Sequence, residues 1–146
     1  MEESIMVNEF LEMSSYFDKQ FQLEEVDIKS YSPLTLAYIG DAIYDLVIRT
    51  MVVRQGNVQV NKLHKKTSKL VKAGAQSAMV EVILPHLTNE EIAIYKRGRN
   101  AKSATMAKHA TVSDYRRATG FEALMGYLYL NKDIKRIIDL VKIGLD

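Results

Sequence analysis

Residues 33–48 read PLTLAYIGDAIYDLVI, a nearly unbroken apolar run in which Gly40 and Asp41 are adjacent. Ser32-Pro33 is typical of a helix N-cap followed by a first-turn proline, so the run predicts a helix that extends to about Val53. Apolar residues on all sides of a helix indicate that other elements surround it, so we expect this helix to be buried. A buried carboxylate such as Asp41 normally loses its charge, pairs with a cation or binds a metal.

A second acid stands in a similar setting further along the chain. Residues 120–128 read GFEALMGYL, with Glu122 between apolar residues and two glycines. If the two helices pack through their glycines, Asp41 and Glu122 lie close together, and their repulsion requires a cation or a shared proton. The chain has no cysteine and only three histidines, so oxygen ligands favour Mg²⁺ or Mn²⁺ over zinc at such a site.

The residues alone leave a structural alternative open, in which each acid pairs with an arginine. Arg49, Arg116 and Arg117 are the available cations. Asp45 precedes Arg49 by four residues and is better suited to a helical ion pair than to the metal site.

The rest of the chain is also helical in pattern, and no alternation typical of β-strands persists. We expect one helix over residues 4–17, another over about 57–75 and a third that ends at Leu84. A short helix should then begin with the capping box at Thr88 and fade at 97–100. A long loop should follow to about Val112, and two last helices should be capped by Ser113 and Asn131. The fold class predicted is all-α, with an acidic, partly helical extension at 1–30 and one domain at 31–146.

The composition narrows the function classes. A chain of 146 residues without cysteine excludes disulfides, thiolate nucleophiles and cysteine-based zinc sites. No secretory signal or membrane span is visible, so we expect a soluble, cytoplasmic domain. The net charge of +2 hides an asymmetry, because residues 1–30 hold 8 acidic and 2 basic side chains whereas residues 61–117 hold 12 basic and 4 acidic ones. The basic segment indicates an anionic partner, with a merely solvated surface as the alternative.

Four motifs resemble one family. Residues 36–42, LAYIGDA, resemble the signature helix of the ribonuclease III endonuclease domain, and residues 121–126, FEALMG, resemble its second acidic helix. Residues 63–66, LHKK, and 96–103, KRGRNAKS, are similar to the short bacterial Mini-III branch, which has no separate double-stranded-RNA-binding domain.

The resemblance implies an all-α endonuclease that acts as a homodimer on double-stranded RNA, with maturation of the large-subunit (23S-type) ribosomal RNA precursor as its task. It implies Asp41 and Glu122 as both the catalytic residues and the ligands of Mg²⁺ (or Mn²⁺), which activates water for attack on a phosphodiester. Typical ribonuclease III enzymes carry two further acids, and Ala37 and Thr119 stand at those positions here. A catalytically silent RNA-binding or ribosome-associated protein of the same fold is therefore the alternative.

The basic motifs provide the predicted RNA-binding residues. Basic side chains gain affinity for phosphates mainly through counterion release, and an A-form duplex is recognised through its shape and backbone. We expect RNA contacts from His64, Lys65, Lys66, Arg97, Arg99, Asn100, Lys102 and Ser103.

Overall fold

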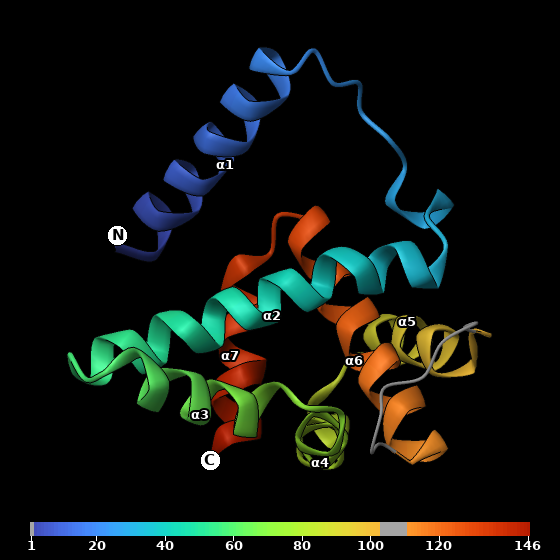
Figure 1. Ribbon diagram of the computed structural model, residues 1–146. Helices are drawn as coiled ribbons and strands as arrows, with labels where there is room; N and C mark the ends of the chain where they lie inside the picture. The colour runs from blue at the N-terminus through green and yellow to red at the C-terminus, as the bar shows by residue number, and fades with distance from the viewer. Residues whose placement is uncertain (1, 103–110) are drawn as a thin grey trace.

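The computed structural model describes the backbone of residues 2–102 and 111–146, and the side chains within these ranges from residue 9 onward. This part of the chain contains seven α-helices, two short 3₁₀ turns and no strand (Figure 1), which confirms the all-α prediction. The helices are α1 (Glu2–Gln20), α2 (Pro33–Gln55), α3 (Val60–Val71), α4 (Ala73–Ile83), α5 (Asn89–Asn100), α6 (Val112–Leu130) and α7 (Ile134–Leu145), and the turns are Ile28–Ser30 and Leu84–His86.

Helix α6 is the centre of the fold. It packs against α2, α5, α4 and α7, and every residue from Ala118 to Leu128 except Glu122 is buried. The ring of Phe121 lies edge-on to that of Tyr44 on α2, with 4.9 Å between the ring centres. A helix surrounded in this way is apolar because its neighbours exclude water from nearly all of its surface. Glu122 is thus the one carboxylate in the stretch 118–128 of α6, which is otherwise buried.

Helix α2 begins as predicted, since the Ser32 hydroxyl accepts a hydrogen bond from the backbone N–H of Thr35. The expectation that α2 is buried all round was wrong. One face packs on α6, but Tyr38 is 83% exposed and Leu46 is 62% exposed. Helices α6, α3 and α5 cover part of α2, and the chain leaves the face with Tyr38 and Leu46 exposed.

Three helix ends differ from the sequence predictions. Helix α5 continues to Asn100, so Arg97, Arg99 and Asn100 lie on a helix and not in the expected loop. Thr111, and not Ser113, caps α6, and Asp133, and not Asn131, caps α7. Several polar residues near a helix start can each act as a cap, and packing decides between them.

The stretch 57–75 is also shorter as a helix than predicted. It forms α3 only from Val60 to Val71, and Lys72 then adopts an extended conformation before α4. The capping box at Thr88 is present as expected, with Glu91 bonded back to the Thr88 backbone at 2.8 Å.

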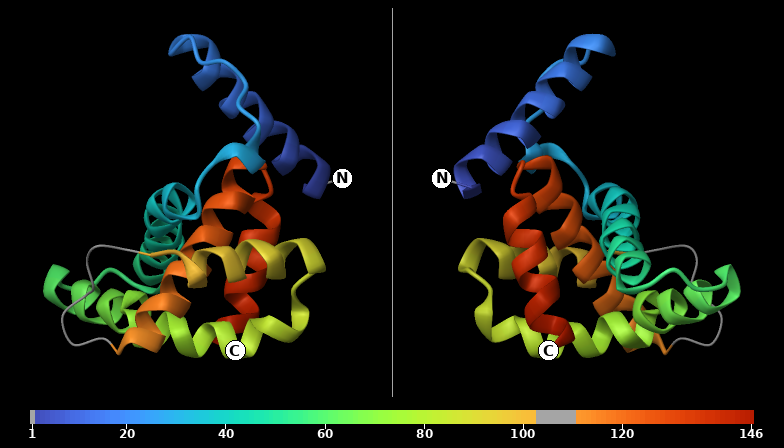
Figure 2. Two further views of the ribbon diagram at one scale, coloured as in Figure 1. Left: turned by 90° about the vertical axis from the view of Figure 1, so that its right-hand side faces the viewer. Right: turned by 90° about the vertical axis from the view of Figure 1, so that its left-hand side faces the viewer.

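Helix α1 stands apart from the other helices in both views of Figure 2. Its described contact with them is the ring of Phe10 against that of Tyr129 on α6, with 6.1 Å between centres. Figure 2 places α2 and α3 on one side of the helical body and the start of α1 toward the other side. Nowhere in the described residues is there a helix with the length and apolar run needed to cross a membrane.

Candidate active site

Two glycines bring α2 and α6 into backbone contact beside the two acids. A Cβ atom on Gly40 would lie 1.7 Å from the carbonyl oxygen of Glu122, and one on Gly126 would lie 1.9 Å from the carbonyl oxygen of Leu36. Neither position has room for any other residue, because the opposing atoms belong to the main chain. The prediction that the helices pack through glycine is confirmed, and this packing sets the separation of Asp41 and Glu122.

The two carboxyl groups meet at the edge of this contact. Asp41 is exposed and Glu122 is half-buried, so the expectation of two deeply buried acids was wrong for Asp41. Burial, followed by a hydrogen bond to Asp41 and the charge of that residue, raises the pKa of Glu122 to about 9. Without a cation, Glu122 is therefore protonated at neutral pH and can share its proton with Asp41.

A cleft between α2 and α6 holds this pair. Besides Asp41 and Glu122 it is lined by Leu34, Ala37, Tyr38, Ile39, Ala42, Tyr115 and Thr119. The two positions where typical ribonuclease III enzymes carry acids, Ala37 and Thr119, both face this cleft and are each 8% exposed. Among the described residues no group of three or more histidines, cysteines or acids could share one ion, and Asp41 and Glu122 are the two carboxylates that line this cleft.

The alternative of structural arginine pairs is not supported. Arg49 pairs with Asp45 through an Nε to Oδ2 distance of 2.8 Å, as expected from their spacing. Arg117 pairs with Glu81 on α4 at 2.8 Å. Arg116, the third candidate, forms no ion pair with either acid among the described residues, and the hydrogen-bond partner of Glu122 is Asp41.

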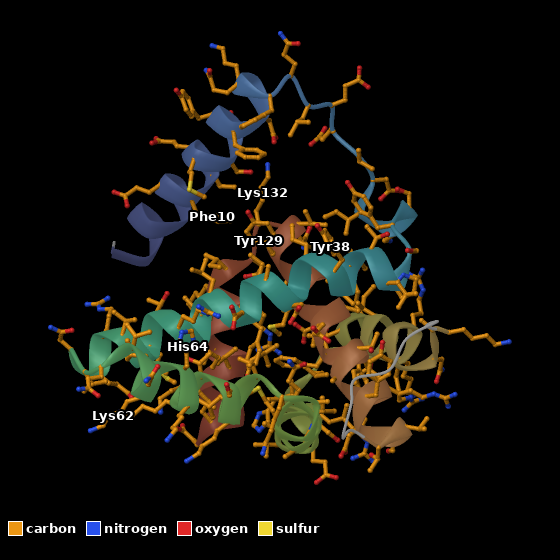
Figure 3. The ribbon with its side chains drawn as sticks, in the orientation of Figure 1. Phe10, Tyr38, Lys62, His64, Tyr129 and Lys132 are labelled. Atoms are coloured by element: carbon orange, nitrogen blue, oxygen red, sulfur yellow. The ribbon has the colours of Figure 1, made fainter. Side chains whose placement is uncertain are left out.

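The predicted RNA-binding residues fall into two groups on either side of the central helices. His64, Lys65 and Lys66 are exposed on α3, and Figure 3 shows His64 and Lys62 on this helix, beyond the C-terminal half of α2. Arg97, Arg99 and Asn100 lie at the end of α5 and Lys102 follows it. All of these are exposed except Arg99, which is half-exposed with its guanidinium 5.8 Å from the ring centre of Tyr95. Ser103 lies outside the described residues.

The structure adds a cleft residue that the motifs did not indicate, Tyr115. It lies one turn before Thr119 and two turns before Glu122 on α6, and all three line the cleft. Spacing of four and then three residues along a helix is a signal for a shared face, so Tyr115 could have been found from Glu122 once the helix was known.

The comparisons with known proteins bear on this cleft directly. The Ribonuclease III domain family matches residues 34–133, which include α2, α6 and both acids. The chain belongs to the ribonuclease III family. Mini-ribonuclease 3 of Clostridium tetani is 48% identical over 135 residues, covering 92% of this chain and 89% of that protein. Mini-ribonuclease 3 of Staphylococcus aureus is 45% identical over 112 residues, covering 75% and 84%.

A solved structure agrees with these relatives. The crystal structure of a Fusobacterium nucleatum protein matches with a TM-score of 0.75 and 36% identity, covering 83% of this chain and 97% of that one. The predicted membership of the Mini-III branch is thus confirmed, and the chain is an endoribonuclease of double-stranded RNA.

Proposed function

We propose that the chain uses Mg²⁺ held by Asp41 and Glu122 to cleave double-stranded RNA, and that its task is maturation of the large-subunit ribosomal RNA precursor. The observation that carries the metal proposal is the carboxyl pair in the cleft. One acid is protonated without a cation, because burial and its neighbour raise its pKa to about 9. A divalent cation would replace that proton and relieve the repulsion.

The donor set suits magnesium. Carboxylate oxygens are its preferred protein ligands, and it keeps several waters instead of requiring a complete protein cage. Bound there, the ion would lower the pKa of a water and neutralise charge at the phosphorus. The chain's own contribution is to hold two carboxylates at a separation set by Gly40 and Gly126, in a cleft open enough to admit a phosphodiester.

The basic residues support a duplex as the ligand. Helix α3 and the end of α5, which carry these exposed cations, lie on either side of α6 in Figure 1, and α1 begins on the side of the molecule away from α3 in Figure 2. We assign RNA contacts to these residues as the sequence suggested, and we divide the chain at residue 30 into an extension and a catalytic domain.

A second copy of the chain is the proposed partner of α2. Its outward face carries Leu34 at 39%, Tyr38 at 83% and Leu46 at 62% exposure, and Figure 3 shows Tyr38 on the open edge of α2. Large exposed apolar faces on a soluble domain indicate an interface. A homodimer through this face would place two clefts on one duplex, and we locate this protein with its ribosomal RNA substrate in the cytoplasm.

The test is cleavage of a 30-base-pair RNA with and without Mg²⁺, using wild type, Asp41→Asn and Glu122→Gln. We expect metal-dependent cleavage by wild type and loss of at least about 100-fold in both variants, with RNA binding retained. Glu81→Gln, which removes an exposed acid of an ion pair on α4, is the matched control and should cleave normally. RNA binding by wild type without any metal-dependent cleavage would instead favour the silent RNA-binding protein.

A further inference from the structure

Helix α3 carries three of the proposed RNA-binding residues, yet little packing holds it to the rest of the fold. Of its residues, all of which are described, only Thr67 is buried. Its neighbours are chiefly α2 and α4, and its N-cap residue makes no capping hydrogen bond within the described part of the chain. A helix of 12 residues is marginally stable in water by itself. Specific contacts with other helices must therefore keep α3 in place.

Two buried side chains bind the C-terminal end of α3, where the last four carbonyl groups have no partner within the helix. The hydroxyl of Tyr44 on α2 donates to the carbonyl oxygen of Leu70 at 2.9 Å. The amide of Gln76 on α4 donates to the carbonyl oxygen of Val71, also at 2.9 Å. Tyr44 is 1% exposed and Gln76 is 2% exposed. Burial raises the pKa of Tyr44 to about 12, so its hydroxyl keeps the proton that it donates.

Tyr44 also connects α3 to the helices of the carboxyl pair. It lies one turn after Asp41 on α2, and its ring packs edge-on against Phe121, which directly precedes Glu122 on α6. In Figure 1, α3 runs back beneath α2 with its C-terminal end toward α4 and α6. The two hydrogen bonds are thus made at the end of α3 that is nearer to the centre of the fold, and they join the basic helix to its neighbours.

The Gln76 side chain combines this hydrogen bond with an unfavourable feature. Its amide oxygen is buried and has no hydrogen-bond partner in the described part of the chain. An unpaired buried acceptor lowers stability, and the flexible side chain of methionine could fill the same space without one. What the amide contributes is therefore its bond to the Val71 carbonyl, which holds α3.

We propose that Tyr44 and Gln76 are positioning residues, which hold the C-terminal end of α3 so that the exposed basic residues of this helix contact the RNA duplex. This inference rests on the proposed RNA contacts of α3. Both residues are buried and act through α3, not by touching RNA. A helix that loses one of these bonds occupies its binding position for only part of the time, and the apparent affinity for RNA falls by that fraction. The net strength of one hydrogen bond corresponds to roughly a 3-fold to 10-fold change.

The test is a double-mutant cycle in RNA binding, measured by fluorescence anisotropy with a labelled 30-base-pair RNA in EDTA. Tyr44→Phe and Gln76→Met each remove one hydrogen bond to α3, and a double variant, Lys65→Gln with Lys66→Gln, removes cations of α3. We expect Tyr44→Phe and Gln76→Met each to raise the RNA Kd about 3-fold to 10-fold in the otherwise wild-type chain, and less than about 2-fold in the double lysine variant. In Arg97→Gln they should keep their full effect, because that cation lies on α5.

Tyr127→Phe is the matched control. Tyr127 is also buried, and its hydroxyl donates to Glu90 at 2.6 Å, so this variant loses a hydrogen bond between α6 and α5 and leaves α3 unchanged. Its RNA Kd should stay within about 2-fold of wild type. Thermal unfolding is followed for every variant. The Tm of Gln76→Met should stay close to that of wild type, because removal of the unpaired oxygen offsets the lost hydrogen bond, and weaker RNA binding by this variant then reports the position of α3 and not general stability.

Three results would overturn the proposal. An equal rise in Kd with and without the two α3 lysines would show that Tyr44 and Gln76 do not act through this helix. An unchanged Kd in both Tyr44→Phe and Gln76→Met would show that α3 keeps its position without them. A double lysine variant that binds RNA as tightly as wild type would refute the proposed RNA contacts of α3, and this inference with them. Weak binding by the lysine variant together with uncoupled effects of Tyr44→Phe and Gln76→Met would refute this inference alone.

Discussion

Glu122→Gln should make the metal-free protein more stable, because the active-site acid is destabilising in its charged form. The pKa of Glu122 rises from an ordinary 4.5 to about 9 in the folded state. An acid whose pKa is raised by folding contributes no penalty below its unfolded pKa, and its effect becomes increasingly unfavourable as the pH rises between the two values. Each pH unit in that window costs about 1.4 kcal/mol.

The magnitude follows from these values. At pH 7 the unfolded carboxyl is ionised whereas the folded one is not, and the difference of roughly 2.5 units corresponds to about 3 kcal/mol of lost stability. Glutamine has the same shape and does not titrate, so it removes this penalty. Asp41→Asn should give a smaller gain, because burial is the largest cause of the shift and the interaction with Asp41 comes after it.

The assay is urea unfolding followed by circular dichroism in EDTA at pH 5 and pH 7, at one fixed protein concentration so that association does not alter the comparison. We expect Glu122→Gln to exceed wild type by about 3 kcal/mol at pH 7 and by less than about 1 kcal/mol at pH 5. Glu81→Gln should change stability by no more than about 0.5 kcal/mol, since its ion pair is exposed. A Glu122→Gln protein that is no more stable than wild type at either pH would refute the reasoning.

Gly40→Ala should lower the free energy of unfolding in urea by about 3 kcal/mol or more, because its Cβ would overlap the α6 main chain. Gly56→Ala is the control and should be tolerated, because nothing lies within 4 Å of a Cβ at that position. Equal stability of the two variants would contradict the glycine contact. Thr119→Asp should lower the Mg²⁺ concentration for half-maximal cleavage several-fold by adding a third carboxylate to the cleft, and an unchanged or higher requirement would show that position 119 does not reach the metal. Replacing Arg97 and Arg99 by glutamine should weaken RNA binding and reduce the slope of log affinity against log salt by about 1 to 2; an unaltered slope would remove the end of α5 from the RNA surface.

Local chemistry determined the parts of the fold that the sequence could predict. Ser32-Pro33 and the capping box at Thr88 satisfy backbone groups within a few residues, so their role does not depend on the rest of the molecule. The helical spacing of apolar residues and the occurrence of glycine beside an acid in both α2 and α6 are likewise properties of short segments. The all-α class, the family and the meeting of Asp41 with Glu122 could therefore be predicted from the amino-acid sequence by itself.

Which side chains are buried, and which residues lie next to one another in space, was decided only by the tertiary structure. The nearly unbroken apolar run at the start of α2 does not show which face meets α6, so the exposure of Asp41 and Tyr38 could not be predicted. Helix α5 continues past its expected end because Gly98 packs against α6. The contact is so close that a Cβ added at Gly98 would lie only 2.8 Å from the Cβ of Ala123. The same packing defined the cleft and placed Tyr115 in it. Spacing along the chain determines which residues share a helix face. Only the contacts between helices determine which of these faces are buried and which of them line the cleft.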